Sequence, residues 1–308
     1  MATTEAATER AAPRRPPTSY AAQVEALSRA SVHKYYRAFH DIDWDAPENS
    51  IDPTDPRLEL RAASPLGQSA WYRALPAVER ARLGLEMTCQ IVKFGIGFEA
   101  NLTRGLSEFA GSLPNRSPEY RYALHELIEE SQHSLMFQQL IDQSGTDPVP
   151  AGRVETEFAR LVARSGESFP TLFFFFVLSG ELFIDAENRA QLVDERHPLL
   201  RRVLQIHVTE EARHVRFAEL YLRENVPRLG RLARTSIALV LPFVLEAAQR
   251  SMLMPAPSVV SRFAIPRPVL KELYGPGSAH RRKVEQIAAP LFALLGAEGQ
   301  GKRVFWAR

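Results

Sequence analysis

The sequence predicts an all-α protein, and three observations lead to that prediction. The chain of 308 residues is 45% hydrophobic and 24% charged, a balance typical of a globular domain. After residue 76, its apolar residues recur at helical spacing in long segments. Proline and glycine separate these segments at positions typical of helix ends, and strand-like patterns are limited to short β-branched clusters.

The first 75 residues precede the predicted helices. Residues 1–20 are rich in Ala, Thr, Glu, Arg and Pro and hold no apolar stretch of a secretion signal, so we expect a disordered tail. The segment 41–66 is rich in proline and aspartate, which favours extended chain over regular structure. We therefore interpret residues 21–75 as an arm that wraps the surface.

Helices follow one another over the rest of the chain. Ser117 is a suitable N-cap, Pro118 suits a first helical turn, and Gly145 is a typical residue after a last turn. We expect a single helical domain over residues 21–308, made of the arm, a bundle (76–255) and a C-terminal helical extension (256–308). The predicted helices span residues 78–113, 117–145, 154–164, 170–193, 198–225, 230–254 and 281–295, with an irregular segment at 266–277.

Composition excludes several classes of protein. The net charge of +2 argues against a dedicated nucleic-acid binder, which needs a basic excess. Cys89 is the single cysteine, so the chain has no intramolecular disulfide and no cysteine-based metal cluster, and we expect a cytoplasmic protein. The two most apolar runs, 172–178 and 237–245, are shorter than the roughly 20 residues of a membrane span, so none is predicted.

Two Glu-x-x-His motifs carry the functional prediction. Glu130 and His133 lie in one predicted helix, and Glu211 and His214 lie in another. Residues three apart share a helical face, so each motif directs a carboxylate and an imidazole the same way. His207 lies one turn before Glu211 and extends the second motif. A single motif is common on helix surfaces, but two are typical of bundles that bind two metal ions between carboxylates.

Such a bundle needs one further glutamate on each of two other helices. Glu99 and Glu181 lie in apolar segments before the two motifs, at matching depths of about 20 Å from the hairpin turns at 1.5 Å per residue. The long connection between the hairpins matches the crossover of ferritin-like bundles. We therefore predict a ferritin-like bundle with a carboxylate-bridged dimetal site, whose ligands are Glu99, Glu130, His133, Glu181, His207, Glu211 and His214.

The ligand types indicate the metal. Carboxylates and imidazoles without thiolate suit iron or manganese, and two iron ions (Fe2+/Fe3+) suit a role in oxygen activation. Glu129 and Glu210 are rival ligands, four residues before each histidine, but the spacing of three is the dimetal pattern. Asp185, one turn after Glu181, either orients an imidazole or is an ordinary polar residue near a helix end.

The seven residues resemble the non-haem di-iron arylamine N-oxygenases, the p-aminobenzoate N-oxygenase family. The third imidazole, matched here by His207, distinguishes that family from other ferritin-like oxygenases, and the resemblance covers residues 75–250. It implies a di-iron monooxygenase that uses O2 to oxidise a small-molecule amine toward a hydroxylamine, nitroso or nitro product. It also implies an external electron donor, a ferredoxin or a reductase, and a homodimer.

The sequence leaves two alternative functions open and argues against a third. A di-iron hydroxylase or desaturase acting on an apolar or carrier-bound substrate suits the phenylalanine run 173–176, although most of that run is expected in the core. A ferritin-like iron-binding protein without oxygenase activity is a further alternative. A ribonucleotide-reductase subunit would need a radical tyrosine where this chain has Phe137.

Overall fold

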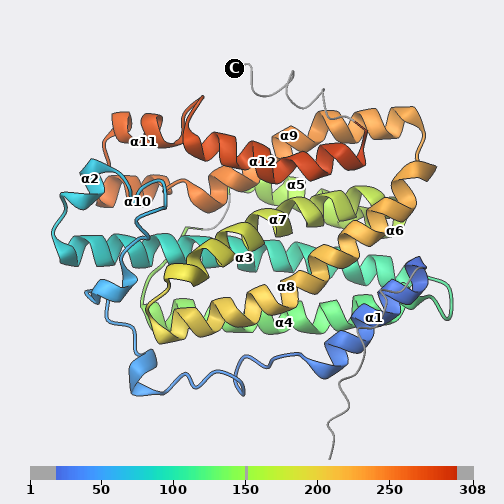
Figure 1. Cartoon of the computed structure of the whole chain (residues 1–308), viewed down its shortest axis with the longest axis horizontal. Coiled ribbons are helices and arrows are strands. Elements are labelled where there is room, and N and C mark those ends of the chain that lie inside the picture. The colour runs from blue at the N-terminus through green and yellow to red at the C-terminus, as the bar shows by residue number, and fades with distance from the viewer. Residues whose placement is uncertain (1–18, 150–151, 297–308) are drawn as a thin grey trace, which may run out of the picture.

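Four long helices form the centre of the molecule (Figure 1). The computed structural model describes residues 19–149 and 152–296, and within those ranges it contains helices, turns and no β-strand. Two consecutive helices form one hairpin, and two later helices form a second that packs beside it. These observations confirm the predicted all-α bundle. The hairpins are α3 (Ala77–Ser112) with α4 (Pro118–Ser144), and α7 (Pro170–Asp194) with α8 (Pro198–Asn225).

The crossover between the hairpins runs through α5 (Arg153–Ala163) and α6 (Ser165–Ser168). Helix α6 approaches α3 closely because both contribute a glycine. A Cβ atom on Gly166 would lie 2.2 Å from the carbonyl oxygen of Gly105, so no larger residue fits between the two backbones. This contact brings the crossover directly onto the bundle.

The N-terminal segment contains more helix than expected. Residues Tyr20–His33 form α1, which packs against α4 and α8, whereas the sequence favours an arm over this stretch. The predicted disordered tail lies outside the described residues except for its last two positions. After α1 the chain follows the edge of the bundle as an arm with short helical turns (Figure 1), namely η1 (Pro47–Asn49), η2 (Pro56–Leu58) and α2 (Ala70–Arg73).

The C-terminal part covers the other side of the bundle. Helix α9 (Arg231–Leu253) packs on α3 and α7, and α12 (Ala279–Leu294) packs on α7 and α9. The prediction of an irregular segment at 266–277 was wrong, because α11 (Arg267–Tyr274) lies there. Its prolines occupy the N-cap and the first turn, where proline starts a helix. The short α10 (Pro257–Arg262) connects α9 to α11.

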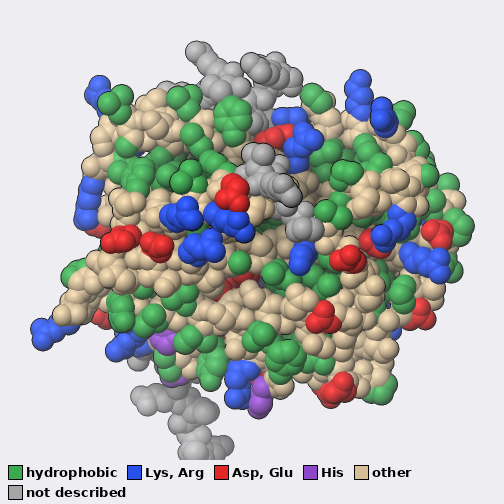
Figure 2. All heavy atoms as spheres, turned by 180° about the vertical axis from the view of Figure 1, so that it is seen from behind, with side chains coloured by type: hydrophobic (Ala, Val, Ile, Leu, Met, Phe, Trp, Pro, Cys, Tyr) green, Lys and Arg blue, Asp and Glu red, His purple; other side chains and the backbone are tan. Residues whose placement is uncertain are grey.

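One segment, Arg231–Arg262, has the length and the mean hydropathy (1.5) to cross a membrane, and 39% of its most apolar stretch is buried inside the protein. The core helix of a soluble protein can meet the same criteria, so these two properties indicate a span only weakly. Figure 2 shows basic and acidic side chains interspersed over the face of the molecule opposite to that of Figure 1. This mixture is in keeping with the small net charge.

Candidate metal centre

The seven residues predicted as metal ligands converge inside the four-helix core. Each is at most 1% exposed. Their side-chain nitrogen and oxygen atoms form three groups, within each of which the atoms lie within 4.8 Å of one another. The first group is Glu99, His133, His207 and Glu211; the second is Glu130, Glu211 and His214; the third is Glu99, Glu130 and Glu181.

Glu211 and Glu130 are central in this cluster. Glu211 lies 3.3 Å from the facing nitrogen of each of the three imidazoles. Glu130 lies 3.1 Å from His133 Nδ1 and 2.7 Å from His214 Nδ1. Two carboxylates in contact with several imidazoles form a donor set that could hold metal ions.

The buried atoms of the cluster fit a pair of cations. Both carboxylate oxygens of Glu181 and Glu211 make no hydrogen bond, and the close contacts of His207 Nε2 and His214 Nδ1 with carboxylates lack hydrogen-bond geometry. Buried polar atoms without partners are costly, and metal coordination would satisfy them. The four carboxylates together carry a charge that two divalent cations would neutralise. The oxygen and nitrogen donors are those that iron and manganese accept.

The pKa shifts of the clustered residues also fit a site for cations. Burial, followed by repulsion from neighbouring carboxylates, raises the pKa values of Glu99 and Glu181 well above their ordinary range. Burial lowers the pKa of His207 to about 4, although Glu211 partly opposes the shift. His207 is therefore neutral near pH 7, whereas carboxylates including Glu130 and Glu211 raise the pKa values of His133 and His214. A bound cation would take the place of the protons on these two rings.

In each imidazole, the ring nitrogen that faces away from the cluster contacts a second polar group. His133 Nε2 lies 2.9 Å from Glu210, and His214 Nε2 lies 2.8 Å from Glu129. His207 Nδ1 lies 2.8 Å from the amide of Asn188. The atom of Asn188 that faces the ring is Nδ2. Turning the amide by 180° presents its oxygen instead, which keeps the ring proton on Nδ1 and leaves the Nε2 lone pair free for a metal. Outer contacts of this kind fix the ring orientation of metal-binding histidines.

These outer contacts revise the sequence-based interpretation. Glu129 and Glu210, considered as rival ligands, each contact the histidine of the opposite motif. Asp185 does not orient an imidazole, because its carboxylate pairs with Arg189 at 2.7 Å. Asn188, which sequence reasoning missed, does so instead. Its signal was its place on α7 two turns after Glu181, on the side facing α8.

A buried arginine links the two outer carboxylates. Arg213 lies 2.9 Å from Glu129 and 3.6 Å from Glu210, and its Nε donates to Ser31 of α1. The backbone N–H of Tyr36 also donates to Glu210, at 2.9 Å. Both α1 and the arm therefore support the outer shell. Sequence reasoning missed Arg213, because its role depends on contacts with distant segments.

A small cavity adjoins the cluster on the side of His207 and Asn188. Its volume is about 40 Å³, and its wall is mostly apolar. A larger cavity of about 410 Å³, under the arm, shares four of its lining residues. The two cavities together offer an approach to the metal centre. The shared residues are Thr88, Ile91, Gln191 and Leu200.

Comparison with known proteins identifies relatives. Residues 17–299 match the family described as P-aminobenzoate N-oxygenase AurF. The chain is 38% identical over 266 residues to the uncharacterized protein MT0908 of Mycobacterium tuberculosis (strain CDC 1551 / Oshkosh). The matched region covers 86% of this chain and 78% of that protein. The uncharacterized protein Mb0909 of Mycobacterium bovis (strain ATCC BAA-935 / AF2122/97) matches to the same extent. No solved structure matches significantly.

Proposed function

This chain belongs to the p-aminobenzoate N-oxygenase AurF family, and from that premise we propose that it is a di-iron monooxygenase that N-oxygenates an arylamine. The reaction consumes the amine, O2, two electrons and two protons, and yields the hydroxylamine and water; further rounds would give nitroso and nitro products. The single observation that carries the proposal is the set of three imidazoles. Each has one nitrogen facing the buried carboxylates and the other held by an outer polar group.

The chain's own residues have defined parts in this proposal. The seven clustered side chains hold two irons, which supply the redox chemistry for reducing O2 when they are bound. Manganese is the alternative metal. Glu129, Glu210 and Asn188 orient the three imidazoles. Phe137, whose ring centroid lies 5.0 Å from that of His207, keeps an apolar wall against the cluster and excludes water.

The amine would enter through the cavity beside His207. That cavity is lined by apolar side chains including Ile91, Ile184 and Val203. Its polar lining residues are Thr88, Asn188, Gln191 and His207. An aromatic ring suits such a wall better than a charged group does. The same wall favours the second candidate function, hydroxylation or desaturation of an apolar or carrier-bound substrate. The two functions differ in whether oxygen is found on nitrogen or on carbon.

The test combines metal content with isotope labelling. Protein loaded anaerobically with Fe(II) is expected to hold two irons per chain. With a reductant and 18O2, it should place 18O on the nitrogen of an aromatic amine from a test panel. His207→Ala should lower both iron content and turnover, whereas His125→Ala, on α4 but outside the cluster, should change neither. Zinc alone, no metal, or label only on carbon would contradict N-oxygenation by two irons.

We also propose that the protein is a cytoplasmic homodimer supplied with electrons by a ferredoxin or a reductase. Helix α9 carries an exposed apolar stripe suited to a second copy, in which Leu232 is 87% exposed and Leu239 is 48% exposed. The double change Leu232→Lys and Leu239→Lys should convert a dimer to a monomer in light scattering. Val193→Lys, at an exposed site of α7, is the control. A wild-type monomer would contradict the proposal.

A further inference from the structure

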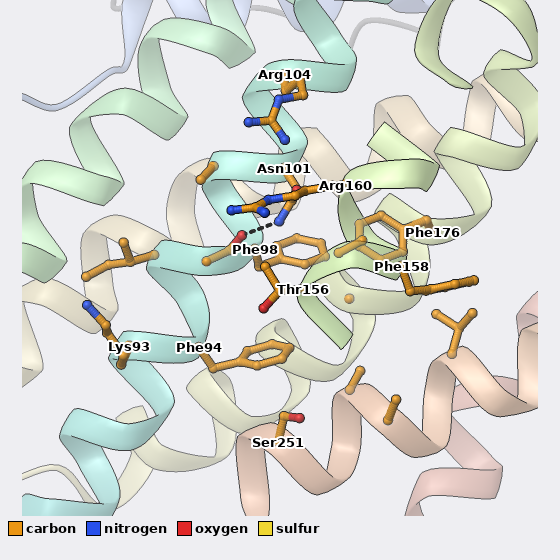
Figure 3. A pocket seen from close by; sticks show the side chains of 18 residues that line it. Lys93, Phe94, Phe98, Asn101, Arg104, Thr156, Phe158, Arg160, Phe176 and Ser251 are labelled. Carbon is orange, nitrogen blue, oxygen red and sulfur yellow. Dashed lines mark hydrogen bonds between the residues drawn. The ribbon is translucent and has the colours of Figure 1, made fainter. Parts of the chain in front are cut away.

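A second cavity lies on the other side of α3 from His133 and His207, between α3, α5, α7 and α9 (Figure 3). Its volume is about 350 Å³, which is within the range of small-molecule sites. Phe94, Phe98, Phe158 and Phe176 form an aromatic wall. The cavity is therefore large enough and apolar enough to bury the body of a ligand.

Basic side chains line the polar parts of this cavity. Figure 3 shows Arg104 and Arg160 at one end and Lys93 at the other. Neither Lys93 nor Arg104 has an ion-pair partner among the described residues. Arg160 pairs with Glu157 on the exposed surface of α5. None of the described residues lining the cavity is acidic, so the lining favours an anion.

The cavity is separate from the metal centre. Its floor is the ring of Phe98, which packs against α7 so closely that a Cβ atom on Gly180 would lie 2.1 Å from it. Phe176 closes the floor from the other side, with its ring centroid 5.6 Å from that of Phe98. Glu99 and Glu181, the next residues along the chain after Phe98 and Gly180, are each 1% exposed. A ligand in this cavity would not need to touch the cluster.

We propose that this cavity binds an amphipathic anion. The apolar body of the ligand lies along the phenylalanines, and its carboxylate or phosphate is held by Arg104 and Arg160. Arginine suits this task because its planar guanidinium binds such groups in a bidentate manner. Lys93 lies about 16 Å from Arg104 along α3, at 1.5 Å per residue, and so marks the far end of the site. The proposal is independent of the di-iron function.

Calorimetric titration of the full chain tests the ligand class. The probes are decanoate, decyl phosphate and the neutral 1-decanol. At least one of the two anions is expected to bind at one per chain, at least tenfold more tightly than 1-decanol. Comparing the two anions identifies the preferred head group. Equal affinity for 1-decanol, or no saturable binding of either anion, would overturn the proposal.

Paired variants test the location. The double change Arg104→Ala and Arg160→Ala should weaken anion binding at least tenfold, whereas Arg223→Ala, an exposed cation of α8, should not. Gly97 lines the cavity with open space where a side chain would begin, so Gly97→Leu should fill the cavity and abolish binding. Gly111→Leu, equally open but outside the cavity, is its control.

Unchanged anion binding in Gly97→Leu would place the probe elsewhere and overturn the proposal. Iron content is measured in parallel. Because none of the substituted residues belongs to the cluster, all four variants should retain the iron content of the wild type. Failure of anion binding with normal iron content thus refutes this inference alone and leaves the di-iron proposal standing.

Discussion

At each motif, two consecutive glutamates contact different partners. Successive residues on a helix point about 100° apart, so Glu130 faces the cluster while Glu129 reaches across to His214. Glu211 and Glu210 repeat the arrangement on α8, where Glu210 contacts His133. The two hairpins therefore hold each other's histidines, which couples the packing of α4 on α8 to the geometry of the site.

Asn188 offers a test of the outer contacts. Asn188→Ala removes the partner of His207 Nδ1, so we expect metal affinity to fall about 10- to 100-fold in a chelator competition. Asp185→Ala, on the same helix, should leave the affinity unchanged, because Asp185 pairs with Arg189 instead. Equal losses in the two variants would contradict the role given to Asn188.

Arg213 offers a test of stability. It is 8% exposed and lies between two buried carboxylates, so Arg213→Met removes the arginine from both and leaves each with its histidine contact alone. We expect the free energy of unfolding in urea to fall by about 3–5 kcal/mol. Arg216→Met, whose side chain is 42% exposed, should cost less than about 1 kcal/mol. A small effect at Arg213 would show that the carboxylates are protonated or otherwise compensated.

The candidate ligands were predictable from sequence, and most of the outer shell was not. Spacings of three and four fix which side chains share a face of one helix, and this spacing is enough to place Glu130 beside His133. The contact of Glu129 with His214 joins residues 85 positions apart. It depends on how two hairpins pack, which helical periodicity does not determine.

At the scale of elements, sequence predicted the long helices and missed several shorter ones, among them α1 and α11. The long helices carry several turns of apolar periodicity between clear end signals, and the left-handed Gly145 indeed follows α4. Helix α1 was missed because proline-rich segments on both sides of it suggested extended chain. Helix α11 was missed because Pro266 and Pro268 resemble helix breakers until their place in the first turn is seen.

The position of α6, in the crossover, depends on a single residue, Gly166. Gly166→Ala would push a methyl group against the backbone of Gly105, so α6 should move away from α3 and the free energy of unfolding should fall by about 1–3 kcal/mol. Gly97→Ala, which has open space on α3, should instead raise it by up to about 1 kcal/mol through helix propensity. Denaturation in urea measures both. Equal effects would show that the close approach does not limit α6.

At the scale of the whole molecule, the bundle buries more carboxylates in its centre than its own buried basic groups can neutralise. Besides the four carboxylates among the candidate ligands, Glu126, Glu129 and Glu210 are buried in the same region, where Arg213 is a buried partner. Burial raises the pKa of Glu126 to about 8. A fold with such an interior should depend on bound cations for its stability.

Removing metal should therefore lower the melting temperature, by roughly 5 °C if the metal is held at 100 times its dissociation constant. The size of the loss should depend on pH. In metal-free protein the pKa values of Glu99, Glu126 and Glu181 are raised, so the stability they contribute is complete below their ordinary pKa and is lost as pH rises through the raised values.

The loss caused by a chelator should consequently be larger at pH 8 than at pH 6.5, measured as melting temperature with and without EDTA. Hydrogen bonds and charges from Glu130 and Glu211 raise the pKa values of His133 and His214 against the effect of burial, and these shifts act in the same direction. The lowered pKa of His207 has the opposite effect on the stability of the metal-free protein, but only below about pH 6.5, where keeping the buried imidazole neutral costs free energy of folding. A chelator effect that is absent, or largest at pH 6.5, would show that the buried carboxylates are not held by metal.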